Sequence, residues 1–247
     1  MLDMTNNSAT RIHNLLSAAS KQPDSKPVVA GWIEIFGVEE KNAHKQVVLV
    51  VNKLNLAFNE IERIRSFLQN SGFNESVYSR TFAKAEAALS PQILHAQWNS
   101  IKQHLTPDVF VSLEYCGEIL PAEEAVVAAE DLDRIKELIK QLRSLLDDGS
   151  VPVALKVLVE HHISIIDAAL SDYPIIGAAS LKRAAKDAIG DFVANSEIIK
   201  ENESSSVVKK LGSLWSTVNK VADGVLKAER LALLGTSLVK ALEHFTK

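Results

Sequence analysis

The sequence contains little glycine, proline and cysteine. Its 247 residues include 10 Gly, 7 Pro and 1 Cys, which is few turn-forming residues for a chain built of β-hairpins. Ala, Leu, Lys and Glu, all good helix formers, are plentiful. We therefore expect an all-α fold. The single Cys116 excludes an intramolecular disulfide and a cysteine-rich metal site, and we expect it to act as a small buried hydrophobe.

The sequence also lacks an excess of basic residues. Lys and Arg number 27 against 31 Asp and Glu, a formal charge of −4, which argues against a general nucleic-acid binder. The first residues lack the basic and apolar blocks of a signal peptide, and the aliphatic run 47–51 is far too short to span a bilayer. Apolar residues make up 47 % of the chain and charged residues 23 %, as in globular proteins. We expect a cytoplasmic globular protein with no nucleic-acid partner.

Five prolines stand where helices are expected to begin, because the first helical turn tolerates a missing N–H. They are Pro91, Pro107, Pro121, Pro152 and Pro174. Together with the spacing of apolar residues they predict helices over 6–20, 28–36, 42–70, 74–88, 91–104, 107–118, 121–147, 152–171, 174–200 and 205–245. The sequence therefore predicts an all-α bundle of about nine to ten helices in one domain, 1–247. A softer division lies near 118–121, between 1–118 and 121–247.

Several predicted helices carry a clear apolar stripe. In 42–70 and 121–147, apolar residues recur every three, four or seven positions, so each segment is expected to be a long amphipathic rod. Segment 152–171 has apolar residues all round, which predicts a helix in the centre of its bundle. Trp32, Phe36 and Trp98 are expected to be core residues.

The C-terminal segment 207–245 is the most amphipathic part of the sequence. Lys209, Lys220 and Lys227 lie opposite Trp215 and its apolar neighbours on a helical wheel, and beyond residue 228 the apolar stripe rotates to the other side. Either the helix breaks there or one helix contacts two different surroundings. Trp215 and the three lysines are candidate residues for binding a partner or an anionic membrane surface, although such a pattern is also typical of an ordinary core helix.

One compact group of titratable residues is a weak catalytic candidate. Glu160 and Asp167 share a helix face, and either His161 or His162 could join them as a base. The adjacent histidines point about 100° apart and cannot chelate one metal ion in the manner of ligands one helical turn apart. We therefore expect no metal, and because the sequence has no glycine-rich phosphate loop we expect no nucleotide cofactor.

These patterns favour a non-catalytic protein that acts by contact with another protein or with itself, as an adaptor, regulator or accessory subunit. A first alternative is a membrane-active effector that uses the basic amphipathic segment 207–245. A second alternative is an enzyme with a helical pocket around residues 160–167, and we consider an enzyme the less favoured class.

Overall fold

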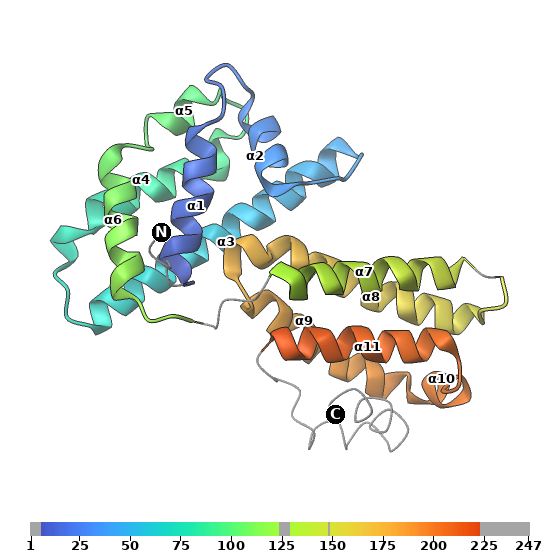
Figure 1. Ribbon diagram of the computed structural model, residues 1–247. Helices are drawn as coiled ribbons and strands as arrows, with labels where there is room; N and C mark the ends of the chain where they lie inside the picture. The colour runs from blue at the N-terminus through green and yellow to red at the C-terminus, as the bar shows by residue number, and fades with distance from the viewer. Residues whose placement is uncertain (1–5, 124–128, 148, 223–247) are drawn as a thin grey trace. The chain divides into compact units, whose positions relative to one another are not determined.

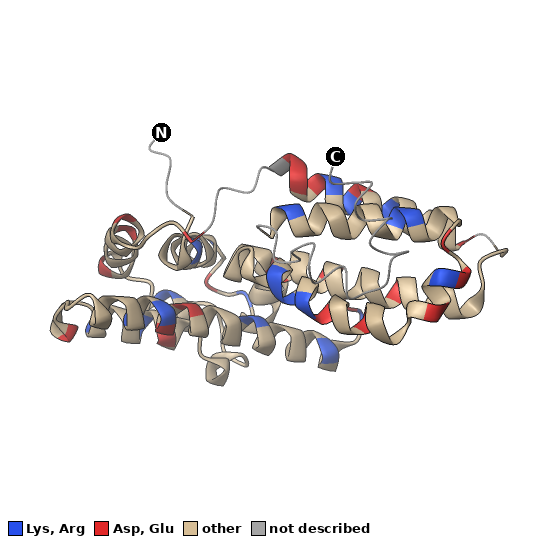
Figure 2. Ribbon diagram, turned by 90° about the horizontal axis from the view of Figure 1, so that it is seen from below, with Lys and Arg blue, Asp and Glu red and all other residues tan. Residues whose placement is uncertain are grey.

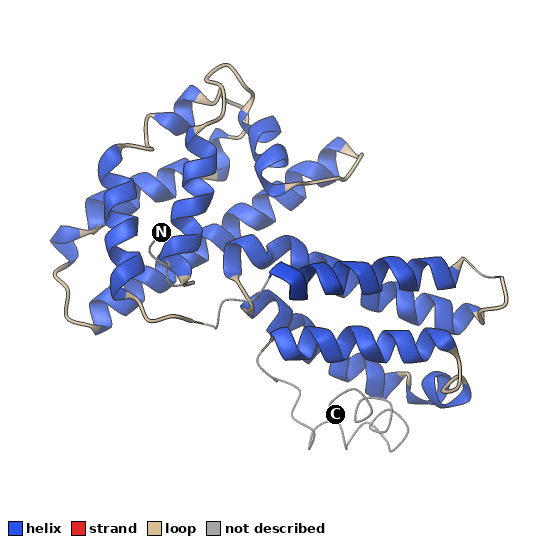
Figure 3. Ribbon diagram, viewed as in Figure 1, coloured by secondary structure: helices blue, strands red, loops and turns tan. Residues whose placement is uncertain are grey.

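The computed structural model describes residues 6–123, 129–147 and 149–222, and in these ranges the protein is all-helical, without strands (Figure 1, Figure 3). The predicted all-α multi-helix bundle is confirmed. The α-helices are α1 (Ser8–Ser20), α2 (Val28–Phe36), α3 (Ala43–Asn70), α4 (Ser79–Ala88), α5 (Asn99–Lys102), α6 (Pro107–Ile119), α7 (Ala129–Leu146), α8 (Val153–Ile176), α9 (Ala179–Ala194), α10 (Ser196–Glu201) and α11 (Ser206–Val221). Two single-turn 3₁₀ helices, η1 (Glu75–Val77) and η2 (Pro91–Ile93), precede α4 and α5.

The helices gather into two compact units. Unit 1 comprises residues 1–126 and 174–177, and unit 2 comprises residues 127–173 and 178–247. The last turn of α8 therefore belongs to unit 1, and the rest of this helix belongs to unit 2. These units are defined by contacts alone. Whether the chain folds as one domain, 1–247, or divides near 118–121 therefore stays a prediction.

Unit 1 is built around the long helix α3. Helix α1 packs against α3 and α6, and α2 packs against α3. The tryptophans of this unit meet in its core: the rings of Trp32 and Trp98 lie 5.2 Å apart, and Trp32 stacks on Phe36. The Trp98 indole N–H donates to the Ala19 carbonyl at 2.8 Å. The prediction that Trp32 and Trp98 are core residues is confirmed, since both are fully buried.

Unit 2 is a bundle in which α11 packs against α7 and α9. Helices α7 and α11 run antiparallel. Lys210, near the start of α11, lies beside Gln141, whereas Lys220, near its end, lies beside Asp131, which comes earlier in α7. The prediction that segment 152–171 is central is wrong. Helix α8 has a solvent face, on which Val153 is 78 % and Val157 59 % exposed. Although apolar residues occur on every side of this helix, only one side of it is buried.

Three of the five prolines precede or begin a helix as predicted, and two do not. Pro91 and Pro107 begin η2 and α6, and Pro152 immediately precedes α8. Residues 121–123 are not helical and Leu120 is extended, the conformation that a following proline favours. Pro174 lies inside the last turn of α8, where it costs one hydrogen bond only, and the helix ends just before Gly177 at φ 62°.

The helix boundaries differ from the predictions where short helices adjoin. The predicted helix 74–88 is η1 followed by α4, and 91–104 is η2 followed by α5. The predicted helix 174–200 is the end of α8, then α9 and α10. Of the predicted helix 205–245 the structure describes α11, and the predicted rotation of the apolar stripe lies outside the described residues.

Candidate functional site

Two of the four predicted catalytic residues, Glu160 and Asp167, line a pocket on unit 2. It has a volume of about 550 Å³ and lies between the end of α7 and the middle of α8. Its polar lining consists of Arg143, Asp147, Glu160, Ser164 and Asp167. The structure thus brings Glu160 and Asp167 together, as their spacing on one helix predicts, and adds Arg143 of α7 and Asp147, which follows the end of α7.

Asp167 is a partly buried carboxyl group in this pocket whose pKa is shifted. Partial burial raises the pKa of its carboxyl group, and the Arg143 guanidinium, which donates to Asp167 Oδ2 at 2.5 Å, opposes that shift. Glu160 lies 3.9 Å from Lys156 on the exposed face of α8. In the described ranges, no three His, Cys, Asp or Glu side chains are placed to hold a metal ion. The pocket offers an ion-paired carboxylate beside two further acids, an arrangement able to bind a cation or a basic group.

Neither histidine belongs to this pocket. His161 is exposed, and its Nε2 lies 3.0 Å from Asp191 Oδ2 on α9. His162 points into the interior of unit 2 and is fully buried. Because adjacent helical residues diverge by about 100°, one histidine faces solvent and the other faces the core.

His162 is enclosed by aromatic rings. The Phe192 ring of α9 stacks on the imidazole with centroids 4.3 Å apart, and the Trp215 ring of α11 meets it edge-on at 5.6 Å. Among the described residues neither imidazole nitrogen has a hydrogen-bond partner, and the buried Trp215 Nε1 has none either. Burial lowers the pKa of His162 to about 4; the nearby Asp191 carboxylate raises it and His161 lowers it further.

The candidate binding residues of the C-terminal segment divide between surface and core. Lys209 and Lys220 are exposed, and Lys220 Nζ lies 3.6 Å from Asp131 of α7. Trp215 is 1 % exposed, so it belongs to the core of unit 2. Lys227 lies outside the described residues. Blue and red segments are interspersed on the helices of Figure 2, whereas α11 itself has lysines and no acid.

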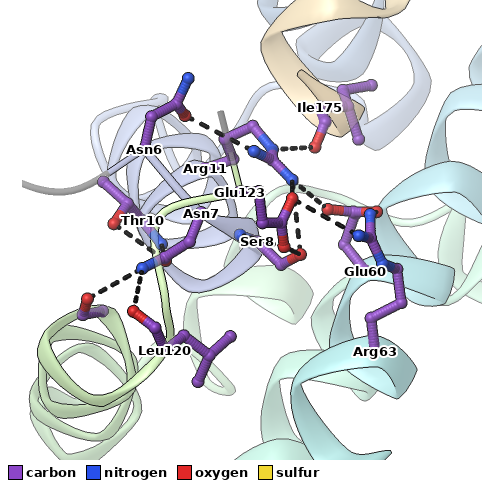
Figure 4. Close-up of polar contacts among 11 residues, drawn as sticks. Asn6, Asn7, Ser8, Thr10, Arg11, Glu60, Arg63, Leu120, Glu123 and Ile175 are labelled. Carbon is purple, nitrogen blue, oxygen red and sulfur yellow. Dashed lines mark hydrogen bonds and ion pairs between the residues drawn. The ribbon is translucent and has the colours of Figure 1, made fainter. Parts of the chain in front are cut away.

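A buried ionic cluster in unit 1 was not anticipated from the sequence (Figure 4). Arg11 of α1 donates from NH2 to Glu60 of α3 at 2.6 Å and to Glu123 at 2.7 Å. Arg63 is 2.8 Å from Glu60 and 3.5 Å from Glu123, so two guanidinium groups bridge two carboxylates. Arg11 and Glu60 are only 6 % and 2 % exposed.

Further hydrogen bonds complete this cluster. The Ser8 hydroxyl donates to Glu123 Oε1 at 2.5 Å, and Arg11 Nε donates to the Ile175 carbonyl at 3.1 Å. Asn7 caps the first turn of α1 and donates to the Leu120 carbonyl. The cluster therefore joins α1, α3, the segment after α6 and the last turn of α8, all within unit 1.

The charges of this cluster stabilise each other. Burial works against the ionised forms of Arg11 and Glu123, yet their mutual hydrogen bonds outweigh it, so the pKa of Arg11 is raised and that of Glu123 is lowered. The sequence did contain a signal for it. Glu60 follows Ala57 and precedes Ile61 and Ile64 on the apolar stripe of α3, and a charged residue inside such a stripe indicates a buried ion pair.

Cys116 is buried among the core residues of unit 1, as predicted, and burial raises the pKa of its thiol to about 11. Within the described part of the chain no helix combines the length and apolar character needed to cross a membrane. No protein-family model, no curated protein and no solved structure matches this chain.

Proposed function

We propose that the chain is a non-catalytic cytoplasmic protein that binds another protein through the first half of α3. The observation that carries this proposal is a group of apolar side chains on that helix, which we call the α3 ridge and define as Val47, Val48, Leu49, Val51 and Phe58; all are exposed except Val51, which is half-buried against the core. Exposed fractions are 36 % for Val47, 58 % for Val48, 39 % for Leu49 and 38 % for Phe58. Large apolar residues that are exposed close together on one helix are typical of interaction sites.

The position of the α3 ridge supports this proposal. The beginning of α3 projects from unit 1 beside α2, beyond the other helices of that unit (Figure 1). Val50, Leu54 and Ala57 attach the helix to the core, Val51 lies at the edge of that contact, and the other ridge residues remain exposed. Between residues 43 and 58, all of which the structure describes, Lys45 is the one exposed charged residue. A large part of this surface can therefore lose water without stripping water from a charge.

The partner that fits this surface is the apolar face of an amphipathic helix. Val47, Val51 and Phe58 fall on one line along α3 at helical spacing, and such a ridge packs into the groove between side chains of a second helix. The exposed Lys45 and Lys41 at the start of α3 favour acidic residues at one end of that partner helix.

Site-specific photocrosslinking tests the proposal. The full-length protein would carry benzoylphenylalanine at position 48, and a matched protein would carry it at the exposed position 69 near the other end of α3. We expect an adduct from position 48 only, in which the crosslinked peptide is an amphipathic helix of another protein. The purified partner should then bind at least about tenfold more weakly to Val48→Glu than to Gln69→Glu.

Two results would refute the proposal. If position 48 crosslinked two copies of the chain to each other, the ridge would mediate self-association, and binding to a separate partner protein would be refuted. Equal labelling from positions 48 and 69, or equal affinity of the two variants, would show that the ridge is not a binding surface.

A second candidate function is binding to an anionic membrane surface through α11. The amphipathic character of α11 favours this function. One face carries the exposed Lys209 and Lys220, and the other carries the buried Leu211, Leu214 and Trp215. Amphipathic helices of this kind lie flat in the headgroup region of a membrane once their apolar face is released. Co-sedimentation of the full chain with phosphatidylserine vesicles tests it. Binding should be lost on substitution of Lys209→Glu with Lys220→Glu and in high salt, and binding that neither change affects would refute it.

A further inference from the structure

His162 occupies the point where three helices of unit 2 meet. It belongs to α8, its stacked neighbour Phe192 belongs to α9, and its edge-on neighbour Trp215 belongs to α11. The imidazole is fully buried, and both of its nitrogens lack hydrogen-bond partners in the part of the chain that the structure describes. A second proton would add a charge and a donor to this space, and the buried Trp215 N–H of α11, which has no acceptor among the described residues, is itself a donor.

The charged groups around the ring do little to stabilise a protonated imidazole. On α8, the neighbouring His161 opposes protonation of His162, and on α9 Asp191 favours it. The Asp191 carboxylate, however, is already 3.0 Å from His161 Nε2. On α11 the lysines point away from the ring: Lys209 and Lys220 are exposed, and Lys210 donates to Gln141 of α7. The acids of α7 face these lysines and solvent, as Asp131 does at Lys220.

We propose that unit 2 contains an acid-operated latch, in which protonation of the His162 imidazole releases α11 from α8 and α9. The ring and its aromatic neighbours hold α11 while the imidazole is neutral. Once protonated, the ring must reach water, and Trp215 of α11 is one of the two rings that enclose it. Release exposes an apolar face made of Leu211, Leu214, Trp215 and Val218 on a helix whose other face carries lysines.

The pH range in which the latch should open follows from the pKa of His162 in its two environments. The pKa of His162 is about 4 in the closed unit and 6.5 when the ring is in water. Acid therefore favours the open form over a range of pH between these values, where each unit multiplies the open-to-closed ratio by close to ten. At pH 5 the ratio should be about 20-fold higher than at pH 7.

Fluorine NMR on the full chain labelled with 5-fluorotryptophan tests the latch, because the tryptophans report on both units. Trp215 lies in unit 2, whereas Trp32 and Trp98 lie in unit 1. We expect the Trp215 resonance to move to its solvent-exposed position between pH 6 and 4, while the resonances of Trp32 and Trp98 keep their neutral-pH positions. In His162→Phe, which retains an aromatic ring but cannot be protonated, the Trp215 resonance should stay unchanged over that range.

His161→Gln is the matched control, because it removes the adjacent but exposed histidine, and its Trp215 transition should persist. An unchanged Trp215 resonance at pH 4 in the natural sequence would overturn the proposal, as would the same transition in His162→Phe. If His162→Phe does not fold, the imidazole of the natural protein is titrated by carbon NMR. A pKa below 5 that coincides with the Trp215 transition supports the latch, and a pKa near 6.5 without such a transition overturns it.

Discussion

Gly31 of α2 lies where the Trp98 ring leaves no room for a β-carbon. A methyl group at this position would overlap the six-membered part of the indole, which is fully buried and held by its hydrogen bond to Ala19. We expect Gly31→Ala to lower the free energy of unfolding by about 1–3 kcal/mol, measured by urea denaturation. Gly190→Ala on α9, where a β-carbon meets nothing within 4 Å, should instead be neutral or stabilising. Equal effects of the two substitutions would contradict this account.

Arg11 is the residue on which the ionic cluster of unit 1 depends. Replacement by methionine keeps much of the side-chain volume but leaves Glu60 and Glu123 close together without their buried cation. We expect Arg11→Met to destabilise the protein by about 3–5 kcal/mol in urea denaturation. Arg63→Met, at a side chain that is 50 % exposed, should cost less than about 1 kcal/mol. If the two variants were equally stable, the cluster would not depend on the buried guanidinium.

Helix α11 begins at a capping serine. The Ser205 hydroxyl accepts a hydrogen bond from the Val208 N–H at 3.2 Å, which satisfies one of the backbone donors that a helix start leaves unpaired. We expect Ser205→Ala to lower stability by about 1 kcal/mol, measured by thermal unfolding followed by circular dichroism. Ser213→Ala, at an exposed position in the middle of the same helix, is the control and should change stability by less than half as much.

The position of a proline relative to a helix depends on what surrounds it. Pro107 begins α6 as its sequence neighbours predict. After Pro121 the chain continues non-helically, and the Glu123 N–H donates to the Asn6 carbonyl while its carboxylate binds Arg11. Tertiary hydrogen bonds thus take the place of those in a first helical turn. The local pattern of Pro followed by Ala and Glu cannot predict these tertiary hydrogen bonds.

At the scale of the whole molecule, acid should weaken the fold in two ranges of pH. The pKa of His162 is lower in the folded protein than in the unfolded chain, so the unfolded chain binds more protons and stability falls as the pH drops from 6.5 towards 4. The full effect of this histidine is about 3 kcal/mol. The pKa of Glu123 is also lowered, from an ordinary value of 4.5, so its stabilising contribution is lost as the pH falls below that value.

Urea denaturation at pH 7.5, 6 and 5 measures the histidine effect before Glu123 is protonated. At pH 5 the free energy of unfolding should be about 2 kcal/mol lower than at pH 7.5. His162→Phe should remove most of that difference. Equal stability at pH 7.5 and pH 5 in the natural sequence would rule out the buried neutral histidine.

The sequence by itself determined the helical fold and most of its long elements. The scarcity of turn residues and the apolar spacing in 42–70 are local properties, and helix formation depends on local properties to a large degree, so α2, α3 and α6 begin and end within about a residue of their predicted bounds. The shared face of Glu160 and Asp167 was likewise predictable, because one helix fixes both.

Only the tertiary structure decided which residues from different helices meet. Arg11, Glu60 and Glu123 are far apart in the sequence, and nothing local pairs them. The same holds for the exposure of Val48, the exposed face of α8, and the burial of His162 rather than His161. Each depends on which side of a helix its neighbours cover, and that is settled when separate helices bury their apolar faces against one another.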